Sequence, residues 1–161
     1  TKDREHYFGE IEDDVMKLTE IGECLKKQII ITPQKRPDMN MEIPAFVIMP
    51  NHVHLLVVIG DNVYNTPIGF EESGFDERGD RRRIQCVSTT ENSFSPQSKN
   101  LASVIRGIKT TITSYALTRG IPFGWQSRFH DHIVRNVDEL NTIANYIENN
   151  VFKWKEDVFY K

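Results

Sequence analysis

The chain has 161 residues, of which 39% are hydrophobic and 27% charged, and its formal net charge is −3. This length and composition fit one folded domain and exclude wholesale disorder and fibrous repeats. No apolar run approaches the roughly 20 residues that span a bilayer, and the start TKDREHYFGE is too polar for a signal peptide. Cys24 and Cys86 lack any paired spacing, so we expect free thiols, a cytoplasmic location and no membrane partner.

A first amphipathic helix is predicted from about Asp13 to Gln28. A run of acidic residues suits its start, because acidic side chains favour the N-terminal end of the helix dipole. The apolar residues at helical spacing are Val15, Leu18, Ile21 (or Gly22) and Leu25.

Two strands are predicted within the apolar, β-branched segment from Glu42 to Ile59. Proline cannot donate a hydrogen bond in a central ladder, so Pro50-Asn51 indicates a kink or tight turn between the strands. The second strand carries His52 and His54.

Residues 61–100 are rich in Gly, Ser, Asn and charged residues, with only scattered hydrophobic ones. A segment of this length predicts a functional or flexible excursion within a single domain over residues 1–161. Its basic run GDRRRI could touch nucleic acid, although the composition favours a solvated excursion.

Two further helices are predicted in the second half of the chain. The first has an apolar stripe and ends near Gly120, before Pro122, while Arg106 and Lys109 lie off the stripe. Its stripe consists of Leu101, Val104, Ile105, Ile108, Ile112 and Tyr115. The second begins at Asn136, whose side chain can cap it, with Glu139 reaching back as in a capping box. Its predicted buried face is Val137, Leu140, Ile143, Ala144, Ile147 and Val151.

These elements predict the fold class. Helices and strands alternate irregularly, and the strands are too few for a doubly wound sheet. The pattern therefore indicates an antiparallel α+β domain.

Charge is uneven along the chain. Residues 99–135 hold six basic and one acidic residue, a net charge of +5, whereas residues 1–61 hold seven basic and eleven acidic residues, a net charge of −4. Such a basic block can bind phosphates even in an acidic protein, and it can equally be a solvated helix face. Its cations are Lys99, Arg106, Lys109, Arg119, Arg128 and Arg135.

His52 and His54 are the first candidates for chemistry. Residues i and i+2 of a strand point to the same face, so the two imidazoles can converge on one cation. A pair of this spacing also occurs often by chance, and two ligands leave a metal site incomplete. A third donor must come from elsewhere in the chain.

Tyr115 is the second candidate. It lies on the apolar stripe of its helix and faces inward, where a packed core tyrosine is the plainer interpretation. A tyrosine nucleophile needs an adjacent cation or base, because a phenol with a pKa of about 10 is protonated at neutral pH.

Four segments carry a resemblance to a known family. They are AFVIMPNHVHLLVVI, LASVIRGIKTTITSYAL, GWQSRFHDHIVRN and NTIANYIENNVFKW, in that order. Together they resemble the single-tyrosine HUH transposases, and most closely the REP-associated tyrosine transposases, relatives of the IS two-hundred-like transposases. The likeness covers nearly the whole chain from about Phe8 to Tyr160, except residues 61–100.

The resemblance implies a ferredoxin-like layout, in which an antiparallel sheet of about four strands with packed helices carries His52 and His54. In this family the fold usually opens with a strand just before the segment that begins this chain. The resemblance therefore implies either an earlier strand or a sheet that is assembled differently.

The resemblance also implies an activity, the metal-dependent cleavage and strand transfer of single-stranded DNA, often beside a hairpin, as in DNA transposition. His52 and His54 match the HUH pair that holds Mg²⁺ or Mn²⁺. Tyr115 is matched to the nucleophile, which attacks the scissile phosphate and leaves a 5′-phosphotyrosine and a free 3′-hydroxyl. Such proteins occur as monomers and as dimers, so a homodimer stays open.

One position departs from the family pattern. A third metal ligand, Gln or Asn, usually lies one helical turn after the tyrosine, where this chain has Arg119. Arginine offers no lone pair to a metal, so the donor could be Gln126, His130 or His132, water could complete the shell, or metal binding could be weakened. Arg119 could instead clamp a phosphate.

The remaining expectations concern DNA. Trp125 and Phe129 are expected to pack rather than to stack on bases, and His130 and His132 form a second histidine pair without a principal metal role. Phosphate contacts are expected from Arg106, Lys109, Arg119, Arg128 and Arg135. The alternative function is a domesticated DNA-binding protein that has lost cleavage. A zinc hydrolase is disfavoured, because no clear third ligand or general base is evident.

Overall fold

The computed structural model describes residues 1–62 and 99–160. The expected excursion at 61–100, with its run GDRRRI and Cys86, falls almost wholly outside the described residues. In chain order the elements are η1 (Lys2–Arg4), β1 (Gly9–Glu12), β2 (Val15–Leu18), α1 (Glu20–Ile31), η2 (Pro37–Met39), β3 (Met41–Ile48), β4 (Val53–Ile59), α2 (Leu101–Thr118), α3 (Val137–Asn149) and η3 (Trp154–Glu156), where η1, η2 and η3 are short 3-10 helices.

A short β-hairpin occupies the start of the helix that was predicted over 13–28, so that prediction is wrong for residues 13–19. β1 and β2 pair antiparallel. Asp13 and Asp14 form the turn with φ angles of 50° and 58°, left-handed values that aspartate tolerates better than most residues. The acidic run therefore turns the chain between two strands and does not start a helix.

The first helix begins only after this hairpin. Thr19 caps α1, since its hydroxyl oxygen accepts a hydrogen bond from the main-chain N–H of Gly22 at 3.2 Å. Gly22 allows a close approach, because a Cβ at this position would lie 2.1 Å from the carbonyl oxygen of Phe8. Phe8 is fully buried, and its main-chain N–H donates to the carbonyl oxygen of Pro50 at 3.0 Å. The first hairpin and α1 are thereby fastened to the turn between β3 and β4.

β3 and β4 form the second antiparallel hairpin, with Pro50 and Asn51 in its turn, as the sequence predicts. The prediction that the second strand carries both histidines is wrong for His52, which lies just before β4, whereas His54 lies within it. Within residues 1–62 and 99–160 the two hairpins form two separate two-stranded sheets. The α+β class is confirmed, but the expectation of one sheet of about four strands is wrong. The hairpins share no ladder because Phe8, just before β1, bonds to the turn at Pro50 and not to a strand edge.

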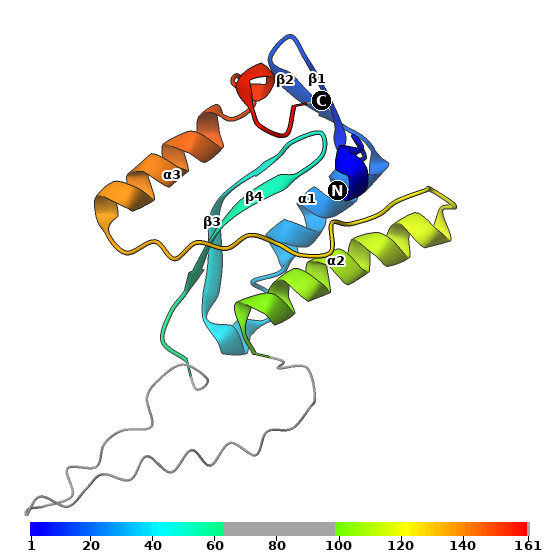
Figure 1. Cartoon of the computed structure of the whole chain (residues 1–161). Coiled ribbons are helices and arrows are strands. Elements are labelled where there is room, and N and C mark those ends of the chain that lie inside the picture. The colour runs from blue at the N-terminus through cyan, green and yellow to red at the C-terminus, as the bar shows by residue number, and fades with distance from the viewer. Residues whose placement is uncertain (63–98, 161) are drawn as a thin grey trace, which may run out of the picture.

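The β3–β4 hairpin lies between two helical layers, with α1 and α2 on one side and α3 on the other (Figure 1). One face of β4 packs against the buried core that includes Ile29 of α1 and Ile112 of α2. This face consists of Val53, Leu55, Val57 and Ile59. Because side chains alternate along a strand, His54 points away from that core, towards Tyr146 on α3.

The helix predicted after residue 100 is confirmed. α2 begins after Asn100, whose side chain accepts from Ser103 N at 2.9 Å, and it ends at Thr118, just before Gly120 with a φ of 66°. No helix in the described part of the chain is long and apolar enough to cross a membrane.

The last helix also begins where the sequence indicates. The side-chain oxygen of Asn136 accepts from the N–H of Glu139 at 2.8 Å. Glu139 does reach back, but its carboxylate accepts from the N–H of Arg135 at 2.8 Å, one residue before the position that a capping box requires. Val137 was predicted to be buried and is 69% exposed, whereas Ile147 is buried as predicted.

Truncation of the α2 core face is expected to destabilise the protein strongly. Ile112→Ala removes a side chain that is fully buried between α1 and α2, and we expect a loss of about 2–5 kcal/mol in the free energy of unfolding. Leu117→Ala, on the same helix but 80% exposed, is expected to change it by less than about 0.5 kcal/mol. Urea unfolding of both variants measures the difference, and equal losses would contradict this assignment of the core.

Candidate metal centre

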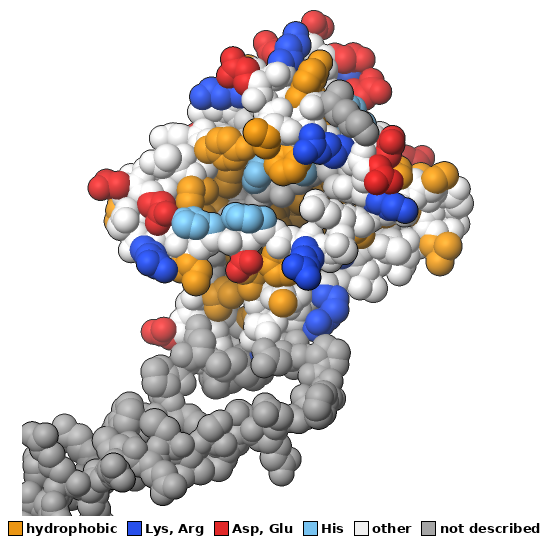
Figure 2. Space-filling model, in the orientation of Figure 1, with side chains coloured by type: hydrophobic (Ala, Val, Ile, Leu, Met, Phe, Trp, Pro, Cys, Tyr) orange, Lys and Arg blue, Asp and Glu red, His pale blue; other side chains and the backbone are white. Residues whose placement is uncertain are grey.

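His52 and His54 are brought together by the turn between β3 and β4. The N–H of Met49 donates to the carbonyl oxygen of His52 at 2.9 Å and closes the turn. The centroids of the two imidazole rings lie 4.8 Å apart, which confirms the prediction that these side chains project together. Figure 2 shows histidine side chains in the middle of one face of the molecule, bordered by hydrophobic side chains and by Lys and Arg side chains.

Asn51 sets the orientation of His52. The amide nitrogen of Asn51 donates to the carbonyl oxygens of Arg4 at 3.2 Å and of Phe159 at 2.9 Å, so its amide oxygen is the atom that faces His52. Nδ1 of His52 lies 2.8 Å from this oxygen and must donate, since an amide oxygen only accepts. In the neutral ring, Nε2 therefore carries the lone pair. A hydrogen-bond partner that fixes the tautomer in this way is typical of metal-binding histidines.

A carboxylate from the C-terminal segment joins the two histidines. Oδ2 of Asp157 lies 3.9 Å from Nε2 of His52, and the side chains are 6% and 13% exposed. The candidate ligand atoms of His52, His54 and Asp157 all lie within 4.8 Å of one another. Ligands on opposite sides of a cation with bonds of about 2.1 Å are about 4.2 Å apart, so small shifts would bring all three onto one ion.

Tyr146 approaches the same cluster from α3. Its hydroxyl oxygen lies 3.5 Å from Nε2 of His54, and the two rings are 5.2 Å apart at an angle of 79°. Tyr146 is 47% exposed, and its partial burial raises its pKa. The side chain of Asn150 lowers this pKa through a hydrogen bond, whereas Asp157 raises it. The structure thus places a tyrosine hydroxyl beside both histidine and carboxylate groups.

Two buried polar atoms near this cluster have no hydrogen-bond partner among the described residues. They are Nε2 of His52 and Oδ1 of Asn150, the residue that caps α3 one helical turn after Tyr146. Such atoms are rare in native proteins, and a lone pair of this kind is what a bound cation uses. The donor set of imidazole nitrogens, a carboxylate and an amide oxygen suits a divalent cation.

The pKa of His52 is lowered to about 4, mainly by burial and to a smaller extent by the neighbouring His54, whereas Asp157 opposes this shift. The pKa of His54 is also lowered by burial, again opposed by Asp157. Both rings are therefore neutral at pH 7, as metal ligation requires. Rings of Trp154 and Phe159 lie 5.9 Å and 4.7 Å from the His52 ring and cover it.

The lowered pKa of His52 predicts how the metal-free protein responds to pH. Between pH 6.5 and about 4 the unfolded chain takes up a proton at His52 that the folded chain does not, so the unfolded state binds more protons. Stability is then fully present above pH 6.5 and falls as the pH decreases to about 4, by on the order of 3 kcal/mol. Thermal unfolding in EDTA measures this, and His52→Gln is expected to flatten the profile. An unchanged slope in that variant would contradict the assignment.

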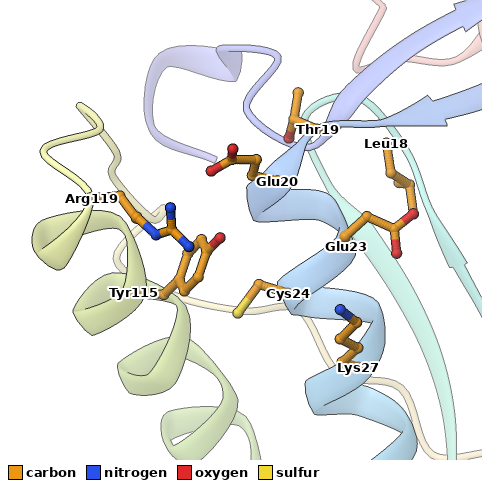
Figure 3. A pocket seen from close by; sticks show the side chains of 8 residues that line it. All are labelled: Leu18, Thr19, Glu20, Glu23, Cys24, Lys27, Tyr115 and Arg119. Carbon is orange, nitrogen blue, oxygen red and sulfur yellow. The ribbon is translucent and has the colours of Figure 1, made fainter.

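Tyr115 lies elsewhere in the molecule. It lines a pocket between α1 and α2, where the guanidinium carbon of Arg119 stands 5.4 Å from the centre of its ring. Figure 3 shows both side chains facing α1. The other lining residues are Leu18, Thr19, Glu20, Glu23, Cys24 and Lys27, and the cluster of His52, His54 and Asp157 contributes none. Within one chain it is therefore Tyr146, and not Tyr115, that lies beside the histidines.

The residues expected as a third ligand are not in the cluster either. The carbonyl oxygen of Gln126 accepts from Nζ of Lys109 at 2.6 Å, and its side chain is exposed. His132 pairs with Glu139 at 2.6 Å on the surface, and His130 is also exposed. In the parts of the chain that the structure describes, His52, His54 and Asp157 form the one group of three side chains suited to a metal ion.

A groove, separate from the pocket at Tyr115, runs along the outer side of α2. Arg106, Lys109 and Phe129 contribute to its wall, together with a row of hydroxyl groups from Thr110, Thr113, Ser114 and Ser127. Trp125 is a packing residue as expected, because it lies against the buried core, with the ring of Phe8 at 5.4 Å. Its indole N–H donates to the carbonyl oxygen of Lys109 at 3.1 Å. Phe129, by contrast, is 42% exposed. Arg128 and Arg135 lie exposed on the segment between α2 and α3.

Comparisons with known proteins add a relative but no function. No protein-family model matches the chain, and no solved structure matches it. A protein of Haemophilus influenzae, described only as uncharacterized, is 28% identical over 163 residues, which cover 99% of this chain and 80% of that protein.

Four residues of the cluster were not singled out from the sequence: Asn51, Tyr146, Asn150 and Asp157. A signal for two of them was present. Tyr146 and Asn150 have the spacing of a tyrosine followed one helical turn later by Gln or Asn, which the family resemblance implies and which Tyr115 and Arg119 do not satisfy. Asn51 and Asp157 carry no such signal, because their roles depend on how the turn at residue 51 meets the end of the described chain.

Proposed function

We propose that this chain cleaves and rejoins single-stranded DNA through a 5′-phosphotyrosine intermediate, in the manner of the HUH transposases that it resembles. The observation that carries the proposal is the meeting of Tyr146 with His54 at 3.5 Å, beside His52 and Asp157. Asn150 one turn after Tyr146 supplies the amide expected of the family. In this proposal Tyr146 takes the role that the family resemblance implied for Tyr115.

The chain's own groups would divide the work as follows. His52 and His54 hold Mg²⁺ or Mn²⁺ through neutral imidazoles, with Asn51 fixing the tautomer of His52. The ion, when bound, polarises the scissile phosphate and places a positive charge beside the phenol. That charge matters because burial raises the pKa of Tyr146 and so opposes its ionisation.

The covalent step is a displacement at phosphorus. The hydroxyl oxygen of Tyr146 forms a bond to the scissile phosphorus and releases its proton to solvent, while the bond from phosphorus to the 3′-oxygen breaks. The departing 3′-oxygen takes up one proton from solvent and becomes a 3′-hydroxyl, so the protons balance. The ester keeps the energy of the phosphodiester bond, so a new 3′-hydroxyl can reverse the reaction. The burial of His52 by Trp154 and Phe159 limits the access of water to this part of the site.

The groove on the outer side of α2 favours a second candidate function, DNA binding without cleavage. Arg106 and Lys109 offer cations and Phe129 an exposed ring, a combination that suits the backbone and bases of a single strand. Arg128 and Arg135 are proposed as further phosphate contacts. Arg119, which lies on the ring of Tyr115, is a weaker candidate for such a contact.

Incubation with hairpin-flanked single-stranded oligonucleotides and Mg²⁺ or Mn²⁺ separates the two functions. The proposal predicts a covalent protein–DNA adduct that resists denaturation and requires the metal. Retained oligonucleotide binding with no adduct in either metal, across the native flanking sequences, would support the DNA-binding protein instead. The same reactions, run over a range of protein concentrations, show whether a homodimer is needed.

A further inference from the structure

We infer that Asp157, from the segment that follows α3, is an anionic ligand of the divalent cation, together with His52 and His54. This inference rests on the metal-binding part of the proposed function. The family resemblance implies two histidines and an amide as ligands. Asp157, which follows β4 and α3 in the chain, would add a carboxylate to that ligand set.

The two oxygens of Asp157 have different surroundings. Oδ1 accepts a hydrogen bond from the main-chain N–H of Phe159 at 2.7 Å, which fixes the orientation of the carboxylate. Oδ2 points to Nε2 of His52 at 3.9 Å, a separation too long for a hydrogen bond. The Asp157 side chain is only 6% exposed, so water does not freely solvate this charge.

A direct contact between the carboxylate of Asp157 and Nε2 of His52, the atom that it faces, is unfavourable. Asn51 holds His52 with its proton on Nδ1, so Nε2 presents a lone pair. A carboxylate oxygen and an imidazole lone pair that face each other in a buried place repel unless a proton or a metal cation lies between them. The geometry of Asp157 and His52 is thus that of two ligands directed at one ion.

A carboxylate ligand would change both the selectivity and the surroundings of the site. Carboxylate oxygens favour hard cations such as Mg²⁺ and Mn²⁺, and one negative charge offsets part of the charge of the ion. Ligation by Asp157 also fastens residues 151–160, which carry Trp154 and Phe159 over His52. Cation binding and the order of this segment are therefore coupled.

Mn²⁺ titration followed by electron paramagnetic resonance tests the inference without DNA. Loss of a hydrogen-bond partner of a ligand already costs about 10- to 100-fold in metal affinity, so we expect Asp157→Asn to raise the Kd for Mn²⁺ at least about tenfold. This substitution keeps the shape of the side chain and the oxygen that accepts from Phe159. Glu156→Gln removes the same charge from the neighbouring exposed residue and is expected to leave the Kd unchanged. Circular dichroism confirms that both variants are folded.

A second measurement on the unmodified chain keeps the test independent of the variants. Lys153 caps η3 and Lys155 lies within it; both are exposed, and Mn²⁺ is expected to slow trypsin cleavage there several-fold. An unchanged Kd in Asp157→Asn, or cleavage that Mn²⁺ does not slow, overturns the inference. If the Kd is unchanged and the covalent adduct still forms, only the role of Asp157 is wrong and the proposed function stands. If the adduct is absent although Asp157→Asn weakens Mn²⁺ binding, the metal site stands and the proposed function fails.

Discussion

Tyr146→Phe is expected to abolish the covalent protein–DNA adduct. The substitution removes only the hydroxyl group that lies 3.5 Å from Nε2 of His54 and keeps the ring that packs on that histidine. Loss of a covalent nucleophile lowers activity by roughly 10³-fold or more, so no adduct should be detected on denaturing gels. Oligonucleotide binding, measured by fluorescence anisotropy, is expected to persist because the phosphate contacts proposed on α2 are unchanged.

Tyr115→Phe is the matched control. It removes the corresponding hydroxyl from the pocket between α1 and α2 and keeps the ring on which Arg119 lies. We expect adduct formation close to that of the unmodified protein. Loss of the adduct in Tyr115→Phe, with the adduct retained in Tyr146→Phe, would exchange the roles of the two tyrosines. It would also require Tyr115 to reach the histidines from a second copy of the chain.

His52→Ala is expected to abolish Mn²⁺ binding and the adduct together. The side chain offers a neutral, oriented Nε2 in the centre of the cluster, and no other imidazole in the described residues lies beside His54 and Asp157. Asn51→Ala is expected to have an intermediate effect of about 10- to 100-fold on metal affinity, because it releases His52 from its tautomer. Calorimetric titration with Mn²⁺, followed by the adduct assay, measures both.

The second histidine pair supplies the control for this prediction. His132→Ala removes a histidine of the same spacing motif that is exposed and paired with Glu139. Metal binding and adduct formation are expected to stay within about twofold of the unmodified protein, as for other surface substitutions. Equal losses in His52→Ala and His132→Ala would show that the metal site had been assigned to the wrong pair.

The fold could be predicted where local pattern decides it. The stripe of α2, the cap at Asn136 and the turn at Pro50 all follow from spacing and from residues with a strong local preference. The hairpin at residues 9–18 was missed because Leu18 fits helical spacing with Ile21 and Leu25, so the strand and the helix overlap in one apolar pattern. The separation into two sheets depends on contacts of Phe8 over more than forty residues, which no local pattern encodes.

The candidate site could be predicted only in part, for a related reason. The alternation of side chains along a strand predicted that His52 and His54 share a face, and their rings do lie together, although only His54 is within β4. Which tyrosine meets them depends on which helix covers that face of β4. Both Tyr115 and Tyr146 lie on helices with an apolar stripe, and only the packing of α3 against the hairpin distinguishes them. The residue one helical turn after each tyrosine was the local signal that could have decided between them. It is Arg119 after Tyr115 and Asn150 after Tyr146, and only the asparagine fits the family pattern.

The position of the covalent bond to DNA tests the central claim most directly. The adduct formed with a short oligonucleotide in Mn²⁺ can be digested with trypsin, and the peptide that carries the nucleotides identified by mass spectrometry. We predict the nucleotides on the peptide Asn136–Lys153, which contains Tyr146. Nucleotides on the peptide Thr110–Arg119, which contains Tyr115, would contradict the assignment.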